Sequence, residues 1–143
     1  TKKMQMQFSA VTFLLEDGTV YVAFRGTDET IVGWREDFDM ALKSPIPSQT
    51  AARLYLRHIA EYTGDAPLIL GGHSKGGNEA VFAAMETEPQ IQDRLRQCTA
   101  RRTDSGKIFI RKKDTDGSKR KSENLCRRIL LWACFCIMRE VIG

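Results

Sequence analysis

The sequence predicts a domain of the α/β class with a largely parallel sheet. Strand-like and helix-like segments alternate between residues 8 and 86, which is the order expected of an α/β sheet. The apolar run 66–70 is short and continuous, as in a strand that is buried on both faces. The glycine-rich turn 71–77 then leads directly into a helix. Together these observations favour parallel strands joined by helices.

The first expected elements form a β-hairpin. Two runs rich in β-branched and aromatic residues, at about residues 8–15 and 20–24, flank Asp17 and Gly18, a dipeptide favoured in tight turns. A short helix should follow, because its apolar residues are spaced four apart and therefore share one face. These residues are Trp34, Phe38 and Leu42.

A second helix is predicted over residues 49–62, after a loop fixed by Pro45 and Pro47. Gly64 should end this helix in the left-handed conformation. The run 78–86 predicts the helix that follows the glycine turn. The apolar side of the second helix is expected to consist of Ala52, Leu54, Tyr55, Leu56 and Ile59.

Charge and cysteine content change sharply along the 143 residues. Residues 1–96 carry a net charge of −3 and residues 97–143 a net charge of +7. All cysteines lie in the second part, at Cys98, Cys126, Cys134 and Cys136. Such a break is typical of a domain boundary, a tail or an artefact. We therefore expect a domain over residues 1–97 and a basic tail, not native to that domain, over residues 98–143.

Several classes of protein are disfavoured. The polar start lacks a signal peptide, and the apolar run 129–138 is too short for a bilayer, which needs about 20 residues. The cysteines have neither the number nor the spacing of a disulfide framework or a zinc site. We expect a cytoplasmic protein with free thiols, no metal and no cofactor. Because the chain enters a strand pattern almost at once, we also expect it to be truncated at its start.

The turn Gly72-His73-Ser74-Lys75-Gly76 matches G-x-S-x-G, the pattern of a nucleophile elbow. In such a turn the serine sits on a strained corner between a strand and a helix, and small residues on both sides avoid collision. The order Ser-Lys-Gly does not fit a Walker loop, and G-x-G-x-x-G is absent. Ser74 is the predicted nucleophile, with a plain structural turn as the alternative.

A candidate oxyanion hole lies near the same edge of the predicted sheet. Thr27 follows Arg25 and Gly26 at the end of the second expected strand, where the serine turn should also open. The Lys75 N–H, at the start of the next helix, would be the other donor. A strand exit capped by Thr27 or Asp28 is the alternative.

Residues 10–38 and 68–84 resemble a bacterial domain-of-unknown-function family with a lipase-like α/β-hydrolase fold. That family is similar to the class 3, fungal-type triacylglycerol lipases, with the motifs F-R-G-T/S, W-x-x-D and G-H-S-x-G-G. The resemblance covers about residues 7–97 and implies a three-layer fold, of which this chain holds part.

The resemblance implies hydrolysis of a small-molecule or lipid ester, with Ser74 as nucleophile and Thr27 and Lys75 in the oxyanion hole. Trp34 and Asp37 match W-x-x-D, and Asp37 would buttress the oxyanion loop. Glu79 departs from the family, which has an apolar residue at that position.

The other members of a catalytic triad are missing. In this fold the order along the chain is Ser, acid, His, yet the histidines are His58 and His73, and both precede Ser74. Without a base, a serine is a weak nucleophile at neutral pH. No acid after Ser74 follows a recognised strand. These acids include Asp93, Asp104, Asp114 and Asp116.

Codons read one base out of register offer an explanation. The codons of residues 126–143 can then encode VPKNTSVGMLLYHERSYR, in which a histidine follows Gly-Met-Leu-Leu. Around residues 97–104 the same register permits V-Y-S-T-A-D-G, which supplies an acid. The hypothesis is that the chain from about residue 98 is a frameshifted reading of the second half of the hydrolase.

Two other interpretations stay open. The net charge of +7 would suit a non-catalytic binding protein whose tail contacts nucleic acid or an anionic surface. Nucleic acid is disfavoured, because no aromatic residue interrupts the basic run 111–121. Alternatively, residues 125–141 form an apolar helix that favours self-association. The sequence leaves the oligomeric state and the substrate open.

Overall fold

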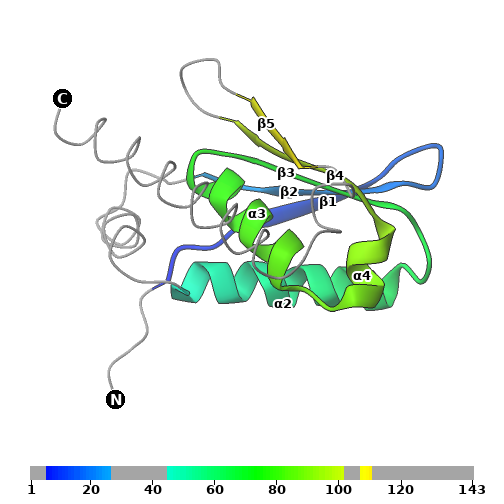
Figure 1. Cartoon of the computed structure of the whole chain (residues 1–143), viewed down its shortest axis with the longest axis horizontal. Helices are drawn as coiled ribbons and strands as arrows, with labels where there is room; N and C mark the ends of the chain where they lie inside the picture. Colours follow the sequence, from blue (N-terminus) through cyan, green and yellow to red (C-terminus); the bar gives the residue numbers. More distant parts are fainter. Residues whose placement is uncertain (1–5, 27–44, 102–106, 111–143) are drawn as a thin grey trace, which may run out of the picture.

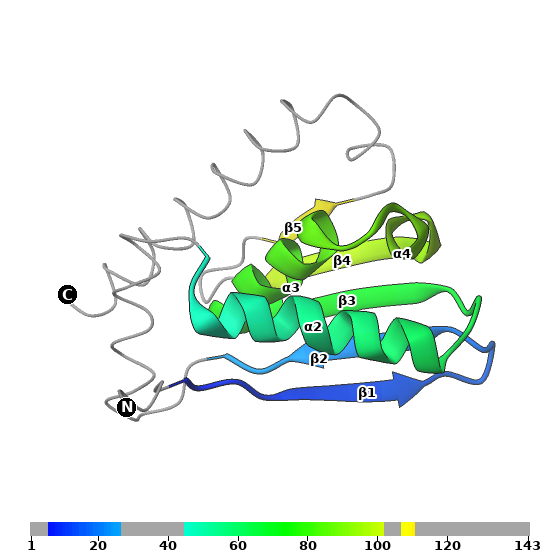
Figure 2. The same cartoon turned by 90° about the horizontal axis from the view of Figure 1, so that it is seen from below.

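The computed structural model describes residues 6–26, 45–101 and 107–110, with the backbone alone for residues 101 and 107–110. Within these residues the chain forms one five-stranded sheet, and the helices cover one of its faces (Figures 1 and 2). The elements are β1 (Ala10–Leu14), β2 (Val20–Phe24), α2 (Pro47–Tyr62), β3 (Leu68–His73), α3 (Lys75–Glu86), α4 (Pro89–Arg94), β4 (Leu95–Arg101) and β5 (Lys107–Ile110).

The strands lie in the order β1-β2-β3-β4-β5. Strands β2, β3 and β4 are parallel, whereas β1 and β5 pair antiparallel at the two edges. Parallel neighbours need crossover connections, which helices supply, and here α2 connects β2 to β3 while α3 and α4 connect β3 to β4. The prediction of an α/β domain is confirmed. The helix expected around Trp34 and Phe38, and the one expected over 125–141, lie outside the described residues.

The hairpin forms as predicted. Strand β2 has its expected bounds, and β1 begins two residues later and ends one residue earlier than expected. Leu14 pairs with Val20 across the turn, and Gly18 has a φ of +79°, which favours glycine. The Asp17 carboxylate accepts a hydrogen bond from the Thr19 N–H at 2.9 Å. This side-chain turn fixes the register of β1 against β2.

Helix α2 begins two residues earlier than expected. Pro47, which was assigned to the loop, is its first residue, because proline has no N–H to lose at that position and its φ already suits a helix. Gly64 follows the helix with a φ of +59°, as predicted. The assignment of Leu54 to the apolar side is wrong, since its side chain is 50% exposed. The buried apolar positions are Ala52, Leu56 and Ala60, and Tyr55 and Ile59 are partly buried against the core.

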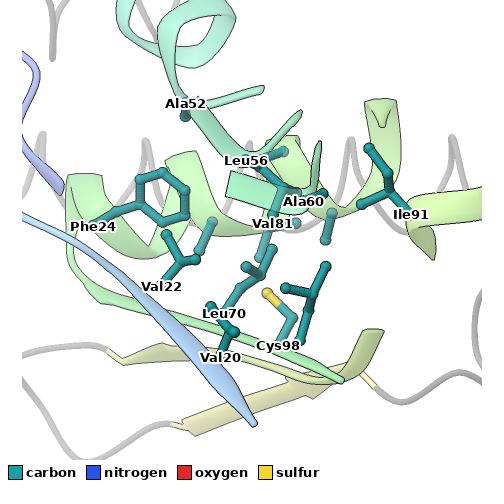
Figure 3. Packing of buried hydrophobic residues seen from close by; sticks show 14 residues of the cluster. Val20, Val22, Phe24, Ala52, Leu56, Ala60, Leu70, Val81, Ile91 and Cys98 are labelled. Atoms are coloured by element: carbon teal, nitrogen blue, oxygen red, sulfur yellow. The ribbon is translucent and has the colours of Figure 1, made fainter. Parts of the chain in front are cut away.

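The core lies between the sheet and helices α2 and α3 (Figure 3). Val22, Leu70, Leu56 and Val81 are fully buried in it, and burial of such side chains supplies most of the stabilisation of a domain. Cys98 of β4 belongs to the same cluster, and it is the free cysteine among the described residues.

Residues beyond Glu86 form elements that the sequence pattern did not reveal. Helix α4 was not expected, and β4 runs past the predicted domain boundary at residue 97, pairing with β3 as far as Arg101. Strand β5 then pairs antiparallel with β4. The foreign origin of residues 98–143 stays a prediction. No helix in the described ranges is long and apolar enough to cross a membrane.

Candidate active site

Ser74 joins β3 to α3 in a strained backbone conformation. Its φ and ψ are 54° and −122°, and among the described residues it is the one non-glycine with a positive φ. Such a conformation costs about 1–3 kcal/mol and persists where the surroundings hold it. Although Ser74 occupies the N-cap position of α3, its hydroxyl makes no capping hydrogen bond. The turn therefore has the strained strand-to-helix geometry of a nucleophile elbow.

Two glycines allow the chain to make this turn. A Cβ added at Gly72 would overlap the Gly76 carbonyl group and lie 2.6 Å from the Gly77 nitrogen. A Cβ added at Gly76 would overlap the Phe24 oxygen and lie 2.7 Å from the Arg25 carbonyl carbon. Any side chain at either position would push α3 away from β2 and β3. The spacing of the G-x-S-x-G motif thus has a direct packing cause.

The end of β2 passes directly beside the serine. A Cβ added at Gly26 would lie 2.9 Å from the His73 carbonyl oxygen and 4.0 Å from the Ser74 Cβ. Thr27 is the next residue along the chain, and it lies outside the described residues, as do Trp34 and Asp37. The sequence analysis did not assign a role to Gly26, although this glycine lies between Arg25 and Thr27 at the end of the expected strand.

Lys75 is the first residue of α3, and the backbone N–H groups of a first helical turn point out of the helix and form the positive end of its dipole. Its side chain has a second role that the sequence did not suggest. The ammonium group is buried and donates to the Gln7 carbonyl oxygen at 3.0 Å and to the Gln7 Oε1 at 3.4 Å. Glu79, one helical turn later, is buried as well, at the position where the resembled family has an apolar residue.

A buried amide bridge joins α2 to α3. The Gln49 Nε2 donates to the Asn78 Oδ1 at 2.8 Å, and the Gln49 Oε1 accepts from the Ile46 N–H at 3.0 Å. Sequence reasoning missed both amide side chains. A signal was present for the cap made by Gln49, which stands three residues after the N-cap Ile46, the spacing of a capping box, with Pro47 at the first helical position. Nothing in the sequence indicated its bond to Asn78.

Neither histidine contacts Ser74. His58 is exposed on α2, whose N-terminus lies beside α3 through the Gln49–Asn78 bridge. His58 follows Gln49 by nine residues, which is about 14 Å along a helix. It therefore lies toward the edge of the sheet that is opposite to the one where Ser74 lies. His73 is exposed at the end of β3, and within the described part of the chain no hydrogen bond joins it to Ser74.

The structure does not test the expectation that no acid after Ser74 follows a recognised strand, because most of these acids lie outside the described residues. Strand β4 ends at Arg101 beside His73, but the described residues do not include Asp104, the acid that follows it in the sequence. Asp93, on α4 at the start of β4, lies toward the other edge. No group of three or more potential metal ligands gathers in the described ranges.

These features place a strained serine, a helix N-terminus and the exit of β2 at one point on the carboxyl edge of the sheet. No curated protein and no solved structure matches the chain. The sequence model of one family, described as Mbeg1-like, matches residues 1–108. This range includes the elbow and all strands from β1 to β4, and it ends before residues 109–143. The chain therefore belongs to the Mbeg1-like family.

Proposed function

We propose that this protein derives from a serine hydrolase of the lipase or esterase type, built on part of an α/β-hydrolase fold. The observation that carries the proposal is the strained Ser74, with a φ of 54°, between a central parallel strand and a helix. A serine that only capped the helix would adopt an extended conformation and hydrogen-bond a backbone N–H of the first turn. Ser74 does neither.

The reaction would follow acyl transfer through a covalent intermediate. The Ser74 Oγ attacks the ester carbonyl carbon, its proton passes to a base and then to the leaving alcohol, and the C–O bond to the alcohol breaks. Water then releases the acid by the same route in reverse. The Lys75 N–H and the Thr27 N–H would hold the oxyanion, worth about 10²–10³ in rate for each such donor. Asp37, with Trp34, would buttress the loop that carries Thr27. The chemistry requires no cofactor or metal.

The base and the acid would come from the neighbouring reading frame. That frame permits an Asp-Gly directly after the codons of β4, and β4 ends at Arg101 beside the end of β3. An acid at that point would stand at the same edge as Ser74, where a triad needs it. The family model matches residues 1–108, so residues 109–143 are the part of the chain for which the proposal of a different origin has the support of the family match. The 143-residue chain should therefore have little turnover.

The test restores the frame by a single-base change near codon 97 and compares the product with the 143-residue chain. We expect the restored chain to hydrolyse p-nitrophenyl butyrate about 10²–10⁴ times faster, the usual contribution of a general base. Ser74→Ala should abolish this activity. Equal labelling of Ser74 in both chains by a fluorophosphonate at neutral pH, or an inactive restored chain, would contradict the proposal.

A non-catalytic binding protein is the second candidate, favoured by the net charge of +7 over residues 97–143. Binding through such a tail depends steeply on salt, because it releases counterions. Retention on DNA or on anionic vesicles that disappears both in high salt and on removal of residues 111–143 would support it. No retention at low salt would remove it.

A further inference from the structure

We propose that Gln49 is a positioning residue for Ser74, an inference that rests on the proposed function. Its side-chain amide connects the start of α2 to the first turn of α3, and through that turn to the serine. Neither Gln49 nor its partner Asn78 belongs to the elbow motif, and neither would touch a substrate bound at Ser74.

Three hydrogen bonds form a continuous chain from the cap of α2 to Ser74. The Ile46 N–H donates to the Gln49 Oε1 at 3.0 Å, and the Gln49 Nε2 donates to the Asn78 Oδ1 at 2.8 Å. The Asn78 N–H then donates to the Ser74 carbonyl oxygen at 3.1 Å. Gln49 and Asn78 are almost fully buried, so water does not compete for these bonds.

The bridge has one possible orientation. The Ile46 N–H can only donate, so the oxygen of the Gln49 amide must face it and the nitrogen must face Asn78. Asn78 must then present its oxygen. Reversing either amide would set two donors or two acceptors against each other, at a cost of about 1–3 kcal/mol for a buried group left unpaired. The bridge therefore fixes both the distance and the rotation of α3 relative to α2.

Such a constraint is what a strained turn requires. The apolar contacts between α2 and α3, such as those of Leu56 and Val81, are non-directional and would let α3 rotate or slide slightly. Gln49 holds the first turn of α3 from the side of α2, while Lys75 holds it through Gln7 in the segment that precedes β1. Because these two contacts hold the first turn of α3, the Ser74 backbone cannot relax, and the Lys75 N–H keeps its direction.

The experiment uses the whole 143-residue chain with the variant Gln49→Met, which keeps the length and burial of the side chain but removes both hydrogen bonds. Gln90→Met, on an exposed position of α4, is the matched control. The first measurement is hydrogen exchange of the Asn78 amide. The second is the rate of Ser74 phosphonylation by an alkyl fluorophosphonate at pH 9, where hydroxide substitutes for the missing base.

We expect Gln49→Met to raise Asn78 exchange by about tenfold or more, because its acceptor on Ser74 is no longer held, and to slow phosphonylation by about tenfold to a hundredfold. Gln90→Met should change neither. Asn78→Asp keeps the acceptor for the Gln49 Nε2 and should retain most of the phosphonylation rate. If Gln49→Met does not fold, Asn78→Ala removes the same bridge from its other end and decides in the same way.

Unchanged Asn78 exchange in the bridge variant would overturn the inference, whatever the phosphonylation rate. Raised exchange with an unchanged rate would also overturn it, because Gln49 would then support the helix without positioning the serine, while the proposed function would stand. If Ser74 of the unaltered chain reacts no faster than the exposed Ser9, the proposed function fails, and Gln49 positions no reacting group.

Discussion

At the scale of single residues, Ser74 stands out because its backbone strain has no structural benefit within the turn. A glycine would adopt the same φ of 54° without strain, because it has no Cβ to clash with the backbone. The serine is thus retained at a cost to stability, which is the pattern expected where a residue serves a reaction.

Ser74→Gly should therefore stabilise the fold. Relief of about 1–3 kcal/mol of strain exceeds the entropic cost of glycine, about 0.5–1 kcal/mol, so the free energy of unfolding should rise by about 1 kcal/mol. Ser9→Gly, at an exposed and extended position before β1, should lower it slightly. Urea denaturation of the three chains measures both effects. A loss of stability in Ser74→Gly comparable to that of Ser9→Gly would show that the turn is not strained.

Cys98 predicts a dependence of stability on alkaline pH. Burial raises the pKa of its thiol from 9.0 to about 12, because the thiolate loses its hydration in the core. Between these values the folded chain binds more protons than the unfolded chain, so this group is fully stabilising below pH 9 and its contribution falls as the pH rises. The slope approaches about 1.4 kcal/mol per pH unit. Cys98→Ala, although less stable overall, should lack this slope in urea titrations at pH 8–11.

At the scale of elements, the sequence predicted best those helices and strands that have a clear apolar pattern. Strand β3 and helix α3 were predictable, because a fully apolar run, glycines and a helical segment follow one another. Strand β4 was not. Gln97 and Thr99 alternate with Cys98 and Ala100 as in a half-buried strand, but the alternation is short and the basic residues on both sides of it resemble a solvated tail. Helix α4 is too short to show a helical period.

The hydrogen bond between Gln49 and Asn78 could not be predicted, because tertiary packing, which the sequence does not display, brings the starts of α2 and α3 together.

The two sides of α2 can be tested with a matched pair of leucines. Leu56→Ala removes a fully buried side chain and should lower the free energy of unfolding by about 3 kcal/mol, since it leaves a cavity. Leu54→Ala, at a half-exposed position of the same helix, should cost less than about 1 kcal/mol. Chemical denaturation distinguishes them. Similar losses in both variants would mean that Leu54 faces the core, as its place in the sequence first suggested.

At the scale of the whole molecule, the described helices lie on one face of the sheet (Figure 1), and apolar side chains of β1 are exposed on the other face. Thr12 bonds to Tyr55 of α2 at 3.0 Å, so its neighbours Val11 and Phe13 face the opposite side, where each is about half exposed. Phe13 stacks on Tyr21 with ring centroids 6.2 Å apart. These apolar side chains belong to β1 and β2, and β1 is an edge strand of the described sheet. An exposed apolar face and an edge strand both favour association between molecules.

Phe13→Lys should therefore reduce self-association of the chain. A charge on this face makes contact between two copies unfavourable, whereas Tyr62→Lys, at an exposed position at the end of α2, should have little effect. Sedimentation velocity at several concentrations compares the two variants with the unaltered chain. Equal self-association in all three chains would show that the molecules associate through another surface, for example through residues 111–143.

The order of elements along the chain has a consequence for biosynthesis. The serine turn and the elements on both sides of it, from β2 to α3, are complete at Glu86, before the codons at which we propose that the two frames diverge. Proteins fold from their N-terminus as they are made, at roughly 5–20 residues per second. The nascent chain can thus form its serine turn whichever frame is read next. A message that slips at this point would yield two polypeptides with the same turn, and the frame alone would decide which of them carries a base for it.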